Sequence, residues 1–154
     1  MSDVVDLLAR EAELVAEFIA ALSDEQRALS QGDIDPLAAI NARKSALAEK
    51  LNTLEAERDA TLAAGGFEAG RSGMARWLAS HDRESSAAAQ WGQLLKLAAE
   101  ARNLNNLNGQ LIALRLQATG EAIATLTARA EQNALYGPDG QAAQITGSRI
   151  IDAA

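Results

Sequence analysis

Side-chain amides and a glycine gather in one stretch of an otherwise alanine- and leucine-rich helical pattern. The segment 102–112 reads RNLNNLNGQLI, and its helix-disfavouring residues are Asn103, Asn105, Asn106, Asn108 and Gly109. Asparagine and glycine in a helix interior cost from several tenths to about 1 kcal/mol each relative to alanine. The segment is not a catalytic motif. Something other than helix stability therefore selected these residues.

The chain has no recognisable enzyme signature. It lacks a phosphate-binding loop, a dinucleotide-binding glycine motif, a zinc-protease motif and a nucleophile elbow. His81 is the single histidine and there is no cysteine, so we interpret His81 as an exposed helix-end residue rather than a metal ligand. Carboxylate pairs such as Glu55 and Glu57 are typical of a solvated helix surface. We expect no enzymatic activity, no cofactor and no metal.

Composition and charge restrict the possible partners. The 154 residues are 48% hydrophobic and carry a net charge of −7, which repels a phosphate backbone and an anionic membrane surface alike. We therefore expect no nucleic-acid partner. The N-terminus MSDVVDLLAREAEL does not resemble a signal peptide, and no run of about 18 apolar residues spans a membrane. The absence of cysteine fits a reducing compartment. We expect a cytoplasmic protein without direct membrane insertion.

Two helices are predicted in the first part of the chain. Apolar residues recur every three or four positions along residues 3–30, which predicts a first helix that Gly32 ends. Asp35 and Pro36 then open a second helix, with a carboxylate at the N-cap and a proline at the first helical position. The apolar stripe of this second helix runs along residues 37–62.

The two helices should form an antiparallel hairpin of defined register. A turn between Ile34 and Asp35 predicts that facing residue numbers sum to 69, so that Phe18 meets Leu51. The same sum predicts two cross-hairpin ion pairs, Glu11 with Arg58 and Glu25 with Lys44. Buried pairs of this kind add little net stability but penalise slipped registers, because slippage leaves a charge unpaired. The alternative is that these long side chains snorkel at the hairpin edge.

Residues 65–83 interrupt the helical pattern. Four glycines within 65–73 predict a flexible connection, and residues 74–80 carry at most a short helix. We expect Trp77 to anchor this crossover against the hairpin.

A single helical pattern resumes over residues 84–132. A continuous helix of that length measures roughly 75 Å, so part of it must project beyond the hairpin. Its apolar face is wider than one hairpin can cover and is interrupted by Asn108 and Arg115. Such a face suggests a surface completed by another helix. The alternative is that Asn108 only fixes register, as a buried asparagine does in coiled coils.

These patterns predict an all-α fold. We expect an antiparallel helical hairpin over about 3–63 plus a long third helix, forming an elongated three-helix bundle or coiled coil. Residues 1–133 would make a single helical domain and 134–154 a flexible C-terminal tail. The tail contains the turn sequence GPDG at 137–140 and keeps bulky apolar residues, which predicts docking either on its own bundle or on a partner.

Several segments together resemble one family. They are LLAREAELVAEFIAALSDEQRAL, KSALAEKLNTLEAERDA, NNLNGQLI at 105–112, YGPDG at 136–140 and the terminal SRII. This combination resembles the FlgN family of small cytosolic chaperones of the flagellar type III export system, over nearly the whole chain. The resemblance implies a chaperone that binds the terminal amphipathic helices of hook-associated (hook–filament junction) proteins. It would prevent their premature assembly and deliver them to an export gate component at the membrane, without using nucleotide.

The resemblance also implies a set of partner-binding residues. Asn105, Asn108 and Gly109 match its asparagine–glycine motif, in which the amides would pair with polar groups of a cargo helix and the glycine would permit close approach. The full implied set is Asn105, Asn108, Gly109, Leu111, Ile112, Ala122, Ile123, Leu126, Tyr136, Ile150 and Ile151. Two alternatives stay open: another type III export chaperone or regulator with different cargo, and a self-associating coiled-coil adaptor. We expect a monomer or a weak homodimer.

Overall fold

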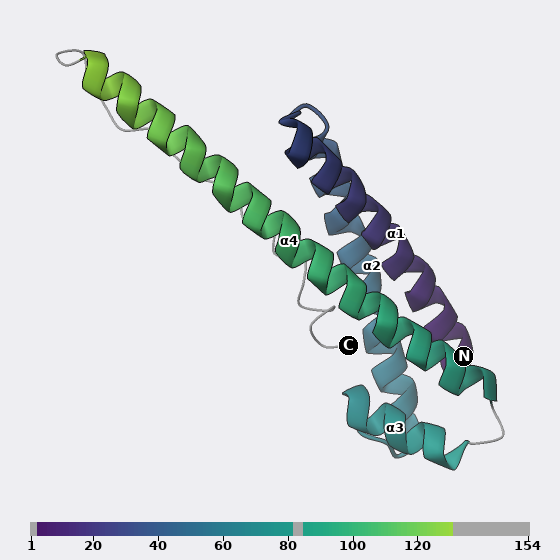
Figure 1. Ribbon diagram of the computed structural model, residues 1–154. Helices are drawn as coiled ribbons and strands as arrows, with labels where there is room; N and C mark the ends of the chain where they lie inside the picture. The colour runs from purple at the N-terminus through teal and green to yellow at the C-terminus, as the bar shows by residue number, and fades with distance from the viewer. Residues whose placement is uncertain (1–2, 82–84, 131–154) are drawn as a thin grey trace.

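The fold is built from helices. A computed structural model describes residues 3–81 and 85–130, and this part of the chain contains no strand (Figure 1). Its helices are α1 (Val4–Gln31), α2 (Leu37–Ala64), α3 (Gly70–Ser80) and α4 (Ser85–Ala130). The prediction of an all-α fold is confirmed.

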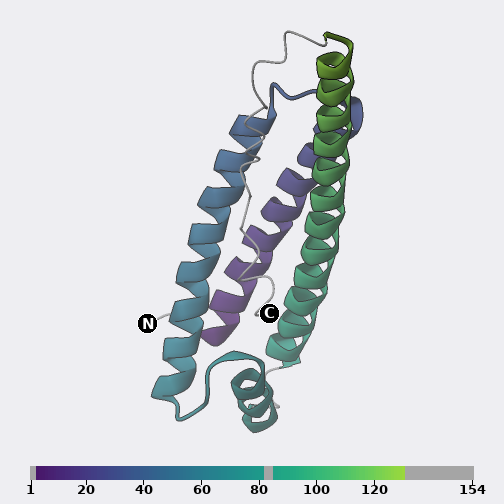
Figure 2. The same cartoon turned by 90° about the vertical axis from the view of Figure 1, so that its left-hand side faces the viewer.

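Helix α1 is the central element, because it packs against both α2 and α4 (Figure 2). The chain reverses after α1, so α2 runs antiparallel to it, and the crossover through α3 then returns α4 to the starting end (Figure 1). Helix α4 therefore runs parallel to α1. Its 46 residues span about 69 Å, against about 42 Å for the 28 residues of α1, so α4 extends well past the hairpin.

The predicted hairpin register is confirmed by both ion pairs. Lys44 Nζ lies 3.1 Å from Glu25 Oε1 and 3.2 Å from Oε2, and Arg58 donates to Glu11 Oε2. All four side chains are at least nine-tenths buried, so the alternative that they snorkel at the hairpin edge is wrong. Phe18 and Leu51 both belong to the buried core.

The helix ends at the hairpin turn agree with the sequence in all but one detail. Gly32 closes α1 in the left-handed conformation, at φ 70°, and its N–H donates to the carbonyls of the last turn. Pro36 has helical dihedral angles at the start of α2, as expected. The predicted carboxylate cap from Asp35 is wrong, since no side chain caps this helix. Instead, Asp33 Oδ1 accepts the backbone N–H of Asp35 at 3.3 Å and shapes the turn.

The glycine-rich crossover is more ordered than the sequence predicts. Helix α3 already begins at Gly70, so the expected flexible connection over 65–73 is wrong for its second half. The reason is a close backbone approach: a Cβ on Gly73 would lie 1.5 Å from the Glu68 carbonyl oxygen. Gly70 also donates its N–H to Asp59 Oδ1 of α2 at 3.2 Å, which places a carboxylate at the positive end of α3.

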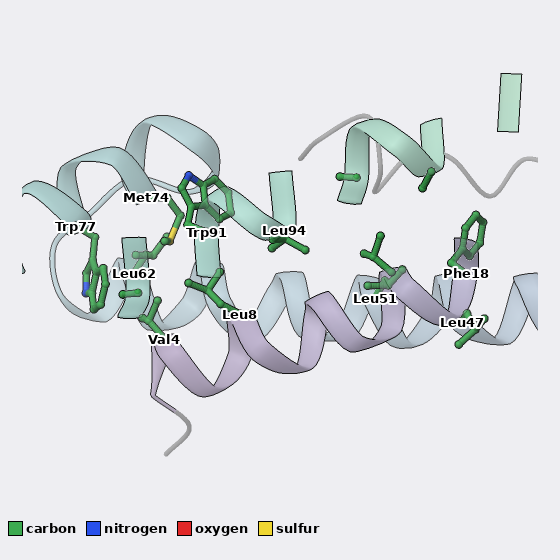
Figure 3. Close-up of a cluster of buried hydrophobic side chains, with 14 of the residues drawn as sticks. Val4, Leu8, Phe18, Leu47, Leu51, Leu62, Met74, Trp77, Trp91 and Leu94 are labelled. Atoms are coloured by element: carbon green, nitrogen blue, oxygen red, sulfur yellow. The ribbon is translucent and has the colours of Figure 1, made fainter. Parts of the chain in front are cut away.

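The crossover is anchored through its tryptophan, as predicted. Trp77 and Met74 are buried in the core beside Val4, Leu8 and Leu62, at the end of the bundle where α3 lies (Figure 3). His81 follows the last residue of α3 and stacks on Trp77 with ring centroids 4.2 Å apart. His81 is therefore a helix-end residue, as predicted, although it is half-buried rather than exposed.

Glycine at position 73 is expected to be required for the docking of α3. Gly73→Ala should lower the free energy of unfolding by about 1–3 kcal/mol, because the new methyl group has to displace backbone rather than a flexible side chain. Urea denaturation measures the change. Gly92→Ala is the matched control, since a Cβ at Gly92 meets nothing within 4 Å. An unchanged midpoint for Gly73→Ala would contradict the close approach.

The Glu11 carboxyl has a pKa well above that of an ordinary glutamate. Burial raises its pKa from 4.5 to about 7, the neighbouring Arg58 opposes this by lowering it, and the carboxylates of Glu55 and Asp59 raise it further. The folded chain therefore keeps a proton that the unfolded chain releases above its ordinary pKa. Protonation of Glu11 therefore stabilises the folded state at low pH, and this contribution is lost as the pH rises to about 7.

A pH dependence of stability follows from this pKa. Between pH 4.5 and about 7 the native chain should lose stability relative to Glu11→Gln, by on the order of 3 kcal/mol in total, because raising the pH favours the unfolded state that has already released the proton. Denaturation midpoints of both proteins across this range test the expectation. A stability difference that stays constant with pH would show that Glu11 ionises as an ordinary carboxyl.

Candidate partner-binding surface

The side of α4 that faces α1 is a seam of residues spaced alternately by four and three. Its buried members are Ala87, Trp91, Leu94, Ala98, Ala101 and Asn108. This spacing brings one side of the helix repeatedly to the same neighbour. The guanidinium of Arg58 lies over the ring of Trp91, 5.1 Å from its centroid, so α4 also contacts one of the hairpin ion pairs.

Helix α4 leaves the hairpin close to Arg115. The Arg115 guanidinium donates from Nη2 to the Ser30 carbonyl oxygen at 3.2 Å, one residue before α1 ends. The last turn of α1 has no basic residue of its own, so Arg115 supplies the positive charge that favours a helix C-terminus. Beyond this contact, α4 continues for about 20 Å past the end of α1.

The projecting part of α4 carries apolar side chains that the described part of the chain leaves largely uncovered. Leu114 is 61% exposed and Leu126 is 64% exposed. We define the distal face as Leu114, Leu116, Ala118, Ala122, Ile123 and Leu126, of which only Ile123 is half-buried. Few charges interrupt this part of the helix: residues 113–130 contain only Arg115, Glu121 and Arg129. An exposed apolar strip of this kind marks a surface for another protein.

Asn108 does not lie on that surface. Its side chain is 1% exposed, and its amide nitrogen donates to the Leu22 carbonyl oxygen at 2.8 Å and to Glu25 Oε1 at 2.9 Å. Both amide hydrogens are therefore used inside the bundle. The interpretation of Asn108 as a partner contact does not fit this geometry, whereas the alternative that it fixes register does.

The remaining predicted residues fall into three groups. Asn105, Leu111 and Ile112 are half-buried along the stretch where α4 separates from the hairpin, and Gly109 is exposed beside them. Ala122, Ile123 and Leu126 belong to the distal face. The predicted contacts Tyr136, Ile150 and Ile151 lie outside the described residues.

Three leucines of this surface were not among the predicted site residues. Leu107, Leu114 and Leu116 are all exposed, at 43% or more. A signal for the first two was present in the sequence, because Leu104, Leu107, Leu111, Leu114 and Ala118 repeat at intervals of three and four. The sequence did not show which of the apolar flanks α1 covers. Without that information the exposed leucines could not be separated from the buried ones.

The arrangement is that of a helical protein with a candidate surface for binding another protein. Among the residues described, no group of three or more side chains is placed to hold a metal ion, and no helix is both long and apolar enough to cross a membrane. What the geometry offers is a long apolar helix face on a rigid support.

Comparison with known proteins identifies the family within that class. The family model described as FlgN protein matches residues 1–144. The chain therefore belongs to the FlgN family of flagellar export chaperones, as its sequence motifs predicted. Chaperones of this family bind hook-associated proteins of the flagellum, and the family is not known for enzymatic activity. No curated protein and no solved structure matches the chain.

Gly109 has no packing role within the described fold, because a Cβ placed there meets nothing within 4 Å. Gly109→Ala should therefore raise the free energy of unfolding by up to about 1 kcal/mol, through the higher helix propensity of alanine. Urea denaturation compares it with Gly92→Ala, which is equally unhindered and should gain a similar amount. A loss of stability confined to Gly109→Ala would reveal a contact of Gly109 inside the chain.

Proposed function

We propose that this chain binds the terminal amphipathic helices of hook-associated proteins through the distal face of α4. It keeps these subunits from assembling prematurely and delivers them to the flagellar export gate. The observation that carries the proposal is the projection of α4 past α1 with exposed leucines at 114, 116 and 126. Family membership supplies the class of cargo.

The distal face suits an amphipathic helix better than an extended strand. A helix surface presents apolar residues in rows, and a second helix with apolar positions three and four residues apart packs into the grooves between them. An extended peptide would need unpaired backbone groups, which the hydrogen-bonded ladder of α4 does not offer. The low charge of residues 113–130 fits a partner held mainly by apolar burial.

Binding of this kind is reversible and needs no nucleotide. Only a narrow strip is buried when one helix covers the distal face, and the cargo segment must lose conformational freedom to become ordered there. The resulting affinity allows both protection and release. We place this exchange in the cytoplasm, with hand-over at the membrane-bound gate, and we include Tyr136, Ile150 and Ile151 as further contacts to cargo or gate.

Charges placed on the distal face should weaken the interaction without unfolding the chain. Leu114→Asp combined with Leu126→Asp should weaken binding to a purified hook-associated protein at least about tenfold, because each carboxylate would have to be buried on binding. Isothermal titration calorimetry measures the affinity, and circular dichroism checks helicity. The matched control is Ala113→Asp with Ala124→Asp, which adds equal charge at exposed positions of α4 outside the distal face.

Further arms of the same experiment separate the rival interpretations. A cargo protein without its terminal helices should not bind, and truncation of the chaperone after Asn133 measures the contribution of the C-terminal segment. If Gly109 admits a close partner helix, Gly109→Ala weakens binding while Gly92→Ala does not.

Equal binding by the distal-face variant and its control would exclude the distal face as the cargo site. Concentration-dependent dimerisation in analytical ultracentrifugation, lost in Leu114→Asp with Leu126→Asp, would favour a self-associating adaptor instead.

A further inference from the structure

A buried polar junction joins α1, α2 and α4. Glu25 of α1 accepts from Lys44 of α2 at 3.1 and 3.2 Å, and its Oε1 also accepts from Asn108 of α4 at 2.9 Å. The second amide hydrogen of Asn108 goes to the Leu22 carbonyl oxygen. Each of the three side chains is at most 2% exposed to solvent. The donors of the junction are paired, but Asn108 Oδ1 is buried without a hydrogen-bond partner, and an unpaired buried acceptor costs stability.

Near Asn108, apolar packing in the α4 seam does little to fix the position of α4 on the hairpin. Between Leu94 and Asn108 the buried seam residues are Ala98 and Ala101, whose side chains bury little area and resemble each other. A displacement of α4 by one heptad keeps the seam toward α1 but exchanges Trp91 with Ala98 and Leu94 with Ala101, so these large side chains oppose the slip at the base of the helix. Near Asn108, where the buried seam residues are alanines, apolar packing adds little to the choice between neighbouring dockings.

Helix α4 contacts both hairpin ion pairs, one near each end of its docked half. Trp91 lies against Arg58 of the Glu11 pair, and Asn108 bonds to Glu25 of the other. The two contacts are about 25 Å apart along α4. Trp91 holds the base of the helix, and Asn108 is its last fully buried residue before the projecting part.

We propose that the Glu25–Lys44–Asn108 junction selects one docking of α4 on the hairpin and thereby sets the point at which α4 leaves the bundle. Asn108 is a positioning residue of the chaperone, and it acts by keeping the distal face clear of the hairpin. A slip of one heptad would bring Ala101 or Arg115 to Glu25, which removes a donor from a buried carboxylate or adds a second buried cation.

The junction contributes specificity rather than stability. Replacement of buried ionic and polar groups by apolar side chains of similar volume is often neutral or stabilising, while the best-attested use of such groups is to fix register. Glu25→Leu, Lys44→Met and Asn108→Leu combined should therefore stay folded but populate more than one docking. The single variant Asn108→Leu leaves the ion pair in place and should also broaden the docking.

Distances between spin labels test this directly, because the chain contains no cysteine that would compete for labelling. Labels on cysteines introduced at the exposed positions Glu49 of α2 and Thr119 of α4 report the docking. The native chain should give one narrow distance distribution. In the triple variant and in Asn108→Leu, a second population displaced by up to about 10 Å, one heptad of helix, should appear. Asn106→Leu, at an exposed neighbouring position, should keep the native distribution.

One narrow native distance in the triple variant would overturn the proposal, because the junction would not be what selects the docking. Unfolding of the triple variant would overturn it as well, since the junction would then serve stability. If Asn108→Leu alone fails to fold, the triple variant decides. The consequence for cargo rests on the proposed function and is measured separately. Altered distances with unchanged affinity for a hook-associated protein would refute the distal face as the cargo site, and leave the junction standing.

Discussion

Two buried carboxylates constrain the whole arrangement. Glu11 and Glu25 lie on the apolar stripe of α1, so the folded chain must provide each of them with a cation. They are two heptads apart and therefore point to the same side of the helix. Arg58 and Lys44 are spaced equally on α2, and only one antiparallel register satisfies both pairs. Helix α4 then completes each pair from the other side, with Trp91 at one and Asn108 at the other.

This use of charge explains why the core is not simply apolar. A stripe of leucines and alanines with a seven-residue repeat has many nearly equivalent alignments, and uniform packing separates them poorly. Buried ionic pairs add little to stability, but breaking one is costly. The raised pKa of Glu11, about 7, reflects the cost of keeping such a carboxyl away from water. The buried ion pairs therefore fix a single arrangement of the helices, although apolar residues at the same positions could give a more stable core.

The sequence was informative where an interaction depended on local spacing. The hairpin register could be derived because the turn position and two pairs of opposite charge agree on one sum of residue numbers. The crossover could not be derived in the same way. Glycines at 70 and 73 suggest flexibility, and only the fold shows that Gly73 makes room for the Glu68 carbonyl oxygen. Both positions need glycine for reasons that the fold sets: Gly70 has a positive φ of 81°, and Gly73 lies too close to a backbone carbonyl for a Cβ.

Asn108 shows the same limit in the candidate site. Its amide chemistry was evident from the sequence, but whether it faces a partner or the interior depends on the alignment of α4 with α1. That alignment cannot be derived from the long crossover between α2 and α4, because the crossover has no spacing rule of its own. Once α4 is aligned, Asn108 lies beside Leu22 and Glu25, and the leucines on the other flank are left exposed. Because the alignment of α4 with α1 was unknown, the sequence showed neither the interior role of Asn108 nor which leucines are exposed.

The arrangement of the helices leaves the end of α4 projecting beyond the hairpin, and this projecting part is the feature that bears on function. A helical extension of about 20 Å is shorter than an isolated helix needs to be stable in water, so it depends on continuity with the docked half. Its seam positions Thr119, Ala122 and Leu126 continue the spacing of the buried seam beyond the end of α1. No second helix among residues 3–81 covers them, because the hairpin ends at the turn after Gln31. A helix that supplied this cover would both bury the leucines and stabilise the extension. Recognition and ordering of the binding surface are then the same event.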